Sequence, residues 1–263
     1  MEKRKLPIAV VDSGVGGISV LAELKKALPH EDFLYFGDSL NAPYGTKSRD
    51  EVLAITRSNL QTLMERGIKA FVLACNTATS AAARVLREEY PDLPIIGVEP
   101  AVKPAAMLCE SPTVLVMATA LTLREEKFNL LVDRFAHRAK VIPLPCTGLV
   151  EMIEAGILDG KPLDDYLGAL FSPYKQEKID AVVLGCTHYP HVRAAIAAHF
   201  PVGTPILDGG EGTARQTGKR LAELSLLREE DHTGKVEILN SSGDPALLAL
   251  SRTLLERATN TSK

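Results

Sequence analysis

Short apolar runs alternate along the chain with longer stretches in which apolar residues recur at helical spacing. Residues 8–11 form the first run, and apolar residues three or four positions apart follow between positions 18 and 28. A parallel connection between strands needs a crossover of a dozen or more residues, usually a helix. The alternation therefore predicts an α/β fold with doubly wound parallel sheets, and the continuous apolar strands are typical of sheets covered on both faces.

The same alternation continues to the end of the chain. The predicted strands are 8–11, 33–36, 71–74, 95–98, 113–117, 140–144, 181–184, 205–207 and 235–240. The longer helices predicted in the remainder are one that carries inward-facing residues from 52 to 63 and stops at Gly67, and those at 80–89, 123–135, 163–171, 190–199, 213–227 and 245–258. The segment after about residue 210 has no counterpart at the end of the first half, so we expect it to return to the first domain.

The pattern restarts near residue 113, which suggests an internal duplication. Cys75 and Cys186 each follow an apolar strand, and 111 positions separate them. Two prolines that each precede a further apolar strand show the same offset. We therefore predict two similar α/β domains, made of residues 1–98 plus 210–263 and of residues 99–209.

Composition narrows the possible functions. The 263 residues are 46% hydrophobic, with a net charge of −3 and a pI of about 6.1, and neither charge value predicts binding to nucleic acid or to a membrane. The chain has no 18-residue apolar stretch, and the start of the sequence does not resemble a signal peptide. Four unevenly spaced cysteines then favour a reducing cytosol.

Cys75 and Cys186 are the strongest candidates for chemistry. Ligands of open α/β sheets bind beyond the carboxyl ends of the strands, which is where both cysteines lie. Each also begins the next turn, and the N–H groups at a helix N-terminus favour a thiolate. Cys109, in an apolar helix-like run, and Cys146, in a loop, lack this context, and we interpret both as structural.

Two opposed thiols can form a redox pair, bind a metal ion or exchange protons with a substrate. A Cys-x-x-Cys redox motif is absent, and Cys186, His188 and His191 lack the paired spacing of a zinc site. We therefore expect no metal ion. One thiolate removing a proton from a carbon beside a carboxylate, with the opposing thiol returning one, remains the favoured chemistry.

Such a reaction needs hydrogen-bond donors where negative charge develops. Asn76-Thr77 follows the first cysteine and Thr187-His188 follows the second. Asp12-Ser13 ends the first strand, and Asp12 is either a partner of Cys75 or of a substrate amino group, or simply a turn former. Pro43-Tyr44-Gly45 is either an ordinary turn or a carboxylate-binding loop. The glycines after Asp12 only weakly match a dinucleotide fingerprint, because its third glycine falls on a serine.

At these residues the chain resembles the glutamate racemases, cofactor-independent enzymes of the aspartate/glutamate racemase superfamily. The matching blocks are Val11-Asp-Ser-Gly-Val-Gly-Gly17, Gly37-Asp38 with Pro43-Tyr-Gly45, Ala74-Cys-Asn-Thr-Ala78, Gly97-Val-Glu-Pro100 and Leu184-Gly-Cys-Thr-His-Tyr-Pro190. The resemblance covers most of the chain. It implies interconversion of L- and D-glutamate, which supplies D-glutamate for peptidoglycan, by a cytoplasmic homodimer.

The resemblance also implies roles for individual residues. Cys75 matches the cysteine that works on the α-proton of D-glutamate, and Cys186 matches the one that works on L-glutamate. Asp12 and His188 match residues that assist them. The positions matching substrate-binding residues are Asp12, Ser13, Tyr44, Gly45, Asn76, Thr77, Thr119, Thr122, Thr187 and His188. Glu154 matches a glutamate of the family, although the neighbouring prolines of the family pattern are missing here.

On the same basis we expect a pseudo-twofold axis between the two domains and an active site in the cleft between them. Some family members carry an N-terminal extension linked to activation by a peptidoglycan precursor, and we expect no such activation because this chain starts almost at its first strand. An aspartate racemase is the nearest alternative, but aspartate-specific relatives tend to carry an acidic residue where His188 stands. A non-catalytic dicarboxylate-binding protein is the alternative from another class, and the presence of both cysteines argues against it.

Overall fold

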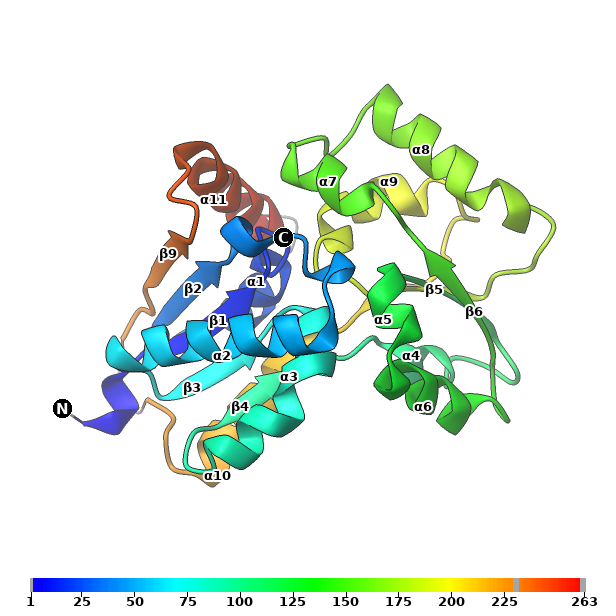
Figure 1. Cartoon of the computed structure of the whole chain (residues 1–263). Coiled ribbons are helices and arrows are strands. Elements are labelled where there is room, and N and C mark those ends of the chain that lie inside the picture. The colour runs from blue at the N-terminus through cyan, green and yellow to red at the C-terminus, as the bar shows by residue number, and fades with distance from the viewer. Residues whose placement is uncertain (1, 229–231, 261–263) are drawn as a thin grey trace. The chain divides into compact units, whose positions relative to one another are not determined.

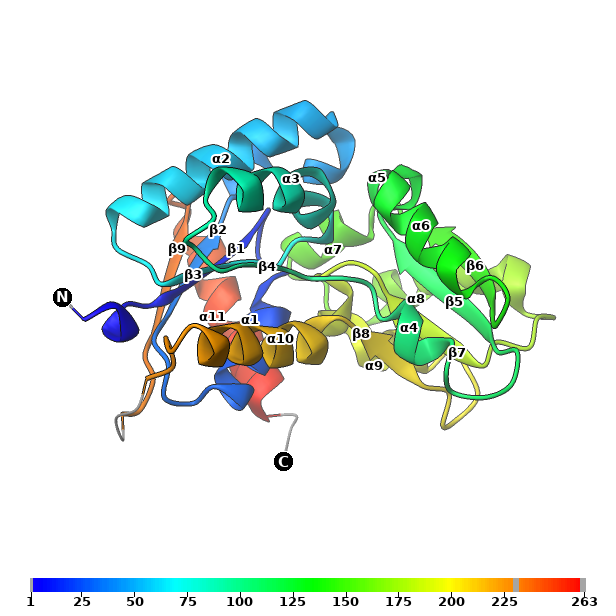
Figure 2. The same cartoon turned by 90° about the horizontal axis from the view of Figure 1, so that it is seen from below.

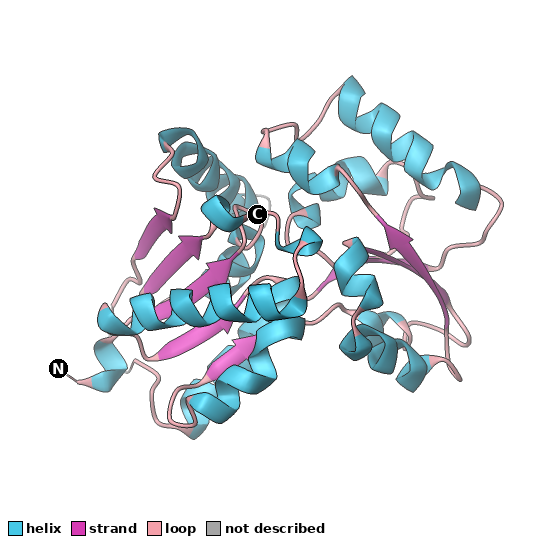
Figure 3. Cartoon of the chain, in the orientation of Figure 1, coloured by secondary structure: helices cyan, strands magenta, loops and turns pink. Residues whose placement is uncertain are grey.

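The computed structural model describes residues 2–228 and 232–260 (Figure 1). The chain divides into two compact units, which are described separately. Unit 1 combines the segment up to Glu99 with the segment from Gly210 onward, and unit 2 is Pro100–Gly209. Every strand pairing within the described residues is parallel (Figure 3). The α/β fold with parallel sheets is thereby confirmed.

Unit 1 contains a five-stranded sheet in the order β4-β3-β1-β2-β9. Its strands are β1 (Ile8–Asp12), β2 (Phe33–Gly37), β3 (Ala70–Leu73), β4 (Ile95–Gly97) and β9 (Val236–Asn240). Its helices are α1 (Ile18–Ala27), α2 (Arg49–Glu65), α3 (Asn76–Glu89), α10 (Gly210–Glu223) and α11 (Pro245–Asn260). Helices α2 and α3 cover one face of the sheet, and α1, α10 and α11 cover the other (Figure 2).

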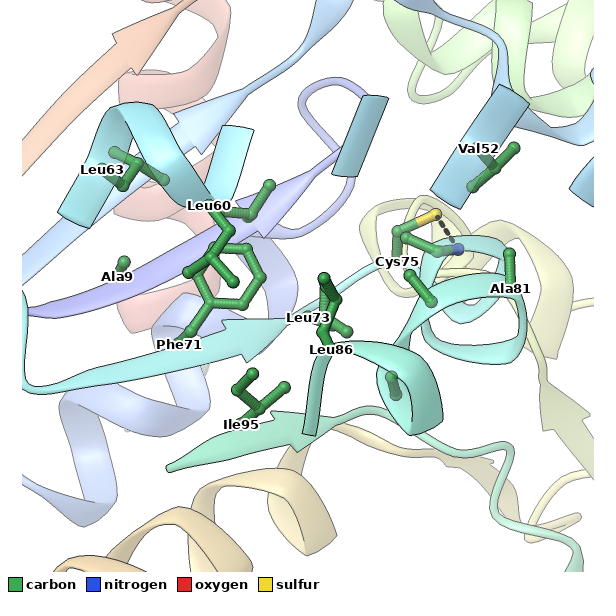
Figure 4. Packing of buried hydrophobic residues seen from close by; sticks show 14 of the residues in the cluster. Ala9, Val52, Leu60, Leu63, Phe71, Leu73, Cys75, Ala81, Leu86 and Ile95 are labelled. Atoms are coloured by element: carbon green, nitrogen blue, oxygen red, sulfur yellow. Dashed lines mark hydrogen bonds between the residues drawn. The ribbon is translucent and has the colours of Figure 1, made fainter. Parts of the chain in front are cut away.

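The core of unit 1 explains why these residues form these elements. Leu60 and Leu63 of α2 and Leu86 of α3 pack with Phe71 and Leu73 of β3, and all five are fully or almost fully buried (Figure 4). Burial of one such side chain stabilises the fold by roughly 1.5–3 kcal/mol. Because β3 contributes buried residues along its whole length, the position of the residue that follows it is fixed by the core.

Unit 2 contains a four-stranded sheet in the order β6-β5-β7-β8. Its strands are β5 (Thr113–Ala118), β6 (Lys140–Pro145), β7 (Ala181–Leu184) and β8 (Ile206–Asp208). Its helices are α4 (Val102–Ala105), α5 (Ala120–Arg124), α6 (Glu126–Phe135), α7 (Leu149–Glu154), α8 (Lys161–Phe171) and α9 (Arg193–Ala197), and a 3-10 helix covers Tyr189–Val192. Pro143 and Pro145 are accommodated because β6 is an edge strand.

The two sheets share one strand order. The order β4-β3-β1-β2 in unit 1 corresponds to β8-β7-β5-β6 in unit 2, and β9 is an addition to unit 1. Strands β3 and β7 are offset by the same 111 positions as the two cysteines that follow them. The internal duplication therefore extends to topology, whereas the pseudo-twofold relation between the units stays a prediction.

Several helix boundaries differ from the sequence-based expectation. Helix α3 begins at Asn76 and not at residue 80, because Cys75 acts as its N-cap. The single helix predicted over 123–135 is two helices, since Glu125 between them has an extended backbone. The helix predicted over 190–199 begins as a 3-10 helix. Helix α4 was not anticipated, because a helix of four residues leaves almost no periodic signal.

A buried ion pair lies at the amino end of β3, opposite to the end that carries Cys75. Lys69 immediately precedes β3, and its ammonium donates to Glu31, to the Arg4 carbonyl at 2.6 Å and to the Leu226 carbonyl at 3.0 Å. The exposed fractions of the Lys69 and Glu31 side chains are 0% and 3%. All three ammonium donors are thus used, and they tie the start of the chain to the segment after α10.

Replacing Glu31 with Gln is expected to lower the free energy of unfolding by about 3–5 kcal/mol, because the buried Lys69 charge loses its counter-ion. Glu237→Gln is the matched control, since it breaks the exposed Arg66–Glu237 pair of the same unit and should cost less than about 1 kcal/mol. Urea denaturation of the three proteins measures both values. An equal loss of unfolding free energy in the two variants would contradict the role of Glu31 as the counter-ion of buried Lys69.

Candidate active site

Cys75 lies at the junction between β3 and α3. Its backbone is extended, and its Sγ accepts a hydrogen bond from the Ala78 N–H at 3.5 Å, which makes the thiol sulfur the cap of the helix (Figure 4). The side chain is buried, with an exposed fraction of 7%. The partial positive charge at a helix N-terminus favours the thiolate form. The structure thus places the first predicted cysteine where a thiolate is stabilised.

Ser13 and Asp12 lie beside Cys75 because β1 and β3 are neighbours in register. Val11 pairs with Leu73, so the residues that follow each strand lie at the same edge of the sheet. The Cys75 thiol is 3.8 Å from the Ser13 Oγ. The Asp12 carboxylate is buried and accepts the Gly14 N–H at 3.0 Å. A Cβ at Gly17 would lie 2.6 Å from the Asp12 Cβ, so this glycine is needed for close packing against the carboxylate.

Tyr44 is held in place by Asp38, a residue to which sequence analysis gave no role. The Tyr44 hydroxyl donates to the Asp38 carboxylate at 2.6 Å, and the Asn59 amide donates to the same carboxylate at 3.0 Å. Burial and the Asp38 hydrogen bond both raise the pKa of Tyr44, so the phenol stays protonated. The sequence did contain one indication of this role, because Asp38 comes directly after β2 and therefore lies at the edge of the sheet that carries Cys75. Gly45 follows in the same 3-10 turn.

Asn76 and Thr77 occupy the first turn of α3 and are both buried. Among the described residues, the Asn76 Oδ1 finds no hydrogen-bond donor. A buried acceptor without a donor costs roughly 1–3 kcal/mol, so a bound group that donates to it would be stabilised. Asp12, Ser13, Tyr44, Cys75, Asn76 and Thr77, with Gly45, are called half-site 1 below.

Cys186 and His188 form the corresponding pair in unit 2. Cys186 follows β7, and its Sγ is 3.7 Å from the Nδ1 of His188. The Nε2 of His188 is 2.7 Å from Glu154 Oε1, which α7 supplies. Cys186, Thr187 and His188 are buried, whereas Glu154 keeps partial contact with solvent. The sequence alone leaves the role of Glu154 open, and the structure places its carboxylate directly against the imidazole of His188.

The charge on His188 is set by three opposing influences. Burial disfavours the imidazolium, but the hydrogen bonds to Cys186 and to the Glu154 carboxylate outweigh it and raise the pKa of His188 well above its ordinary value. An imidazolium at His188 lies where it can stabilise negative charge on the Cys186 sulfur. This is the arrangement expected of a group that assists a thiol base.

Thr119 and Thr122 are brought together at the start of α5. Thr119 is the N-cap of this helix, and its Oγ1 lies 2.9 Å from the Thr122 Oγ1 and accepts the Thr122 N–H at 3.2 Å. Since Met117 pairs with Leu184, Thr119 follows β5 at the level at which Cys186 follows β7. Thr119 thus corresponds to Ser13 of half-site 1. Thr119, Thr122, Glu154, Cys186, Thr187 and His188 are called half-site 2 below.

The other two cysteines differ from each other. The expectation that Cys109 lies in an apolar helix is wrong, because it is exposed in a bend that follows α4. The small and apolar residues that precede Cys109 resemble a helical segment, although the chain bends there. Cys146 is buried, and its thiol donates to the Leu144 carbonyl at 3.4 Å. Burial raises the pKa of Cys146 to about 12, so this thiol is neutral at ordinary pH.

Across residues 2–228 and 232–260, no group of three or more His, Cys, Asp or Glu side chains is arranged to hold a metal ion. Within the same residues, no helix combines the length and the apolar character needed to cross a bilayer.

Both sheets' inner strands, and the cysteines that follow β3 and β7, lie within a segment that matches one family of enzymes. The family model of the Asp/Glu/Hydantoin racemases matches residues 8–217, and the chain belongs to this family. The match includes both half-sites.

Known relatives are similar over nearly the whole chain. A glutamate racemase of Clostridium acetobutylicum is 47% identical over 256 residues, which cover 97% of this chain and 100% of the relative. The structure of Escherichia coli glutamate racemase with L-glutamate and the activator UDP-MurNAc-Ala has a TM-score of 0.85 at 30% identity, with 96% and 95% of the chains covered. Francisella tularensis glutamate racemase with D-glutamate has a TM-score of 0.83 at 28% identity, with 96% and 94% covered.

The substitution Glu154→Gln is expected to lower the pKa of His188, because it removes the negative charge that favours the imidazolium. Glu151→Gln, an exposed position of the same helix, is the matched control and should leave that pKa unchanged. Because the pKa of His188 is raised in the folded protein, protonated His188 stabilises the fold fully below its ordinary pKa of 6.5. This stabilisation is lost as the pH rises through the raised pKa. NMR titration of labelled histidine measures the shift, and identical titrations in both variants would refute the role of Glu154.

Proposed function

We propose that the protein interconverts L- and D-glutamate without a cofactor, by means of the thiols of Cys75 and Cys186. The observation that carries the proposal is the equivalence of the two cysteines. Each follows an inner strand of the same topological position, and each lies among polar groups able to hold an amino acid. The names and full-length similarity of the relatives support glutamate as the substrate.

In the proposed reaction one cysteine acts as a base and the other as an acid. For L-glutamate, the Cys186 thiolate takes the α-proton and becomes a thiol. The Cys75 thiol gives its proton to the opposite face of the carbanion and becomes a thiolate. D-glutamate leaves, and the reverse reaction begins from the thiolate on Cys75. No net proton or electron is gained, so neither a redox partner nor a co-reactant is needed.

The residues around the two thiols differ in charge, and the difference fits their proposed roles. The His188 imidazolium, oriented by Glu154, stabilises a thiolate at Cys186. Cys75 instead accepts the Ala78 N–H at the start of α3, and its thiol donates to the Ser13 hydroxyl, with the Asp12 carboxylate nearby to assist proton movement. Each thiolate is thus stabilised by hydrogen-bond donors that are already in position before the substrate binds.

Substrate binding is assigned to the remaining polar groups of both half-sites. The Asn76 Oδ1, which has no donor among the described residues, fits the substrate ammonium group. The hydroxyls of Ser13, Thr77, Thr119, Thr122 and Thr187, the Tyr44-Gly45 turn and the side chain of His188 are proposed to hold the two carboxylates. Tyr44 is already fixed by Asp38, so its position costs no ordering entropy on binding.

We further propose that the half-sites meet in a cleft between two domains, residues 1–98 plus 210–263 and residues 99–209, related by a pseudo-twofold axis. Closure of such a cleft would exclude water and strengthen the stabilisation of the carbanion. In the cell, a homodimer in the cytosol would supply D-glutamate for peptidoglycan, and the reducing conditions there keep both thiols free to react.

Cys75→Ala and Cys186→Ala are each expected to lower glutamate racemisation by at least roughly 10²–10⁴-fold, because each removes one of two obligatory proton carriers. Circular dichroism follows racemisation from either enantiomer. Mass spectrometry follows deuterium entering the α-position from solvent, with aspartate assayed in parallel. Cys109→Ala is the matched control, since this exposed cysteine lies outside both half-sites.

Near-normal turnover in either alanine variant would contradict the two-thiol mechanism. Binding of glutamate by the wild-type protein without exchange of its α-proton would instead identify a dicarboxylate-binding protein. Faster turnover of aspartate than of glutamate would reassign the substrate while leaving the mechanism in place.

A further inference from the structure

The turn that follows β1 carries Ser13, and a tyrosine of the neighbouring strand β2 holds this turn. Tyr35 is buried, with an exposed fraction of 1%, and its hydroxyl donates to the Gly14 carbonyl at 2.7 Å. The Gly14 N–H in turn donates to the Asp12 carboxylate at 3.0 Å. The peptide groups on both sides of Gly14 are therefore bonded to side chains, and Ser13 lies between the two residues that these bonds fix.

The turn needs an anchor because it is rich in glycine. Residues 13–17 connect β1 to α1, and Gly14, Gly16 and Gly17 are among them. Helix α1 begins at Gly17 without a side-chain cap. Glycine loses more conformational freedom on folding than any other residue, so contacts with the rest of the fold are needed to fix this segment.

Strand β2 meets the turn at a second point. A Cβ at Gly37 would lie 2.6 Å from the Gly14 carbonyl oxygen, a separation that no real side chain tolerates. Gly37 and Tyr35 are two residues apart in β2, so they lie on the same face of the strand. The Gly14 carbonyl oxygen is therefore held against one face of β2, with Gly37 providing the space and Tyr35 the hydrogen bond.

Unit 2 fixes the equivalent turn by another means. Tyr35 pairs with Val10, two residues before the end of β1, and Pro143 pairs with Val116, two residues before the end of β5. Pro143 is therefore the counterpart of Tyr35, and its side chain has no hydrogen-bond donor. There Thr119 directly follows β5 and caps α5. The tyrosine thus accompanies the glycine-rich turn and is replaced where a capped helix follows the strand at once.

Ser13 connects this turn to a candidate acid/base group. The Cys75 thiol donates to the Ser13 Oγ at 3.8 Å. A serine hydroxyl can rotate to donate or to accept, so Ser13 can donate to the sulfur once Cys75 has lost its proton. Hydrogen bonds to an ionised acceptor are stronger than those between neutral groups. The position of Ser13 therefore affects how readily the thiolate forms at Cys75.

We propose that Tyr35 is a positioning residue for the proposed racemase reaction, whose hydroxyl holds the turn after β1 so that Ser13 can donate to a thiolate at Cys75. The proposal rests on the assignment of Cys75 as an acid/base group. The other titratable groups around Cys75 in unit 1 are Asp12 and Tyr44, the latter bonded to Asp38. Replacing Tyr35 with Phe leaves these groups in the chain, so the effect on Cys75 reports the turn.

The test compares Tyr35→Phe with Tyr166→Phe, which also removes a phenol hydroxyl bonded to a backbone carbonyl but does so in unit 2. Initial rates of iodoacetamide labelling are measured from well below to well above the ordinary pKa of a thiol, with peptide mass spectrometry reporting each cysteine. In Tyr35→Phe, the midpoint of the Cys75 curve should rise by about half a pH unit, equivalent to about threefold slower labelling below the midpoint. The Cys186 curve is the control within the same molecule and should not move.

A double-mutant cycle with Ser13→Ala separates positioning from a general loosening of the fold. Ser13→Ala alone should move the Cys75 curve in the same direction. In the Ser13→Ala background, Tyr35→Phe should move that curve by less than half as much as in the wild-type background, because the hydroxyl that Tyr35 positions is already absent.

An unchanged Cys75 curve in Tyr35→Phe overturns the proposal, as does an equal shift in Tyr166→Phe, at Cys186 or in the Ser13→Ala background. The unfolding midpoint of each variant checks that the fold is retained. If Tyr35→Phe does not fold, an unchanged Cys75 curve in Ser13→Ala alone overturns the proposal. Labelling needs no substrate, so absence of glutamate α-proton exchange in the wild-type protein would refute the racemase assignment, while the labelling curves still decide whether Tyr35 positions Ser13.

Discussion

The parallel register of the strands is the constraint on which the rest of this structure depends. Parallel strands all end at the same edge of a sheet, so residues far apart in sequence become neighbours there. Ser13 and Cys75 are 3.8 Å apart for this reason, since Val11 and Leu73 pair directly before them. In unit 2 the pairing of Met117 with Leu184 does the same for Thr119 and Cys186. The buried cores hold the strands in register, and the strand ends in turn determine where the candidate catalytic residues lie.

At their carboxyl edges the two sheets have the same backbone arrangement but different side chains at equivalent positions. Thr77 of half-site 1 corresponds to His188 of half-site 2, Asp12 to Ala118, and Asp38 to Cys146. Cys186 therefore has a histidine beside it, whose pKa is raised and whose far nitrogen contacts the Glu154 carboxylate, whereas half-site 1 has no histidine. In the proposed reaction the α-carbon becomes planar with three different groups attached. No twofold rotation exchanges the two faces of such a carbon, so half-sites with different side chains suit it.

Features that depend on a short stretch of sequence could be predicted from the sequence alone. The apolar strands, their ends and the cysteines that follow were predictable because each signal lies within about ten residues. The start of α3 at Asn76 was not, because a thiol sulfur is an uncommon helix cap and Thr77 and Thr79 have weak helix propensity. The partnerships of Asp38 with Tyr44 and of Glu154 with His188 were also missed. These two contacts depend on the path by which a loop or a short helix returns to the sheet. The spacing of apolar residues along the sequence contains no information about that path.

A buried polar group without a partner shows where binding free energy is available. The Asn76 Oδ1 finds no donor among the described residues, and Asn76 directly follows the cysteine at the end of β3. This unpaired acceptor destabilises the ligand-free protein by roughly 1–3 kcal/mol. At the opposite end of β3, Lys69 has every donor satisfied by Glu31 and two carbonyls. The Lys69 ammonium at the amino end of β3 therefore has no donor left for a ligand, whereas the Asn76 Oδ1 beyond the carboxyl end gains its donor when a substrate ammonium group binds beside it.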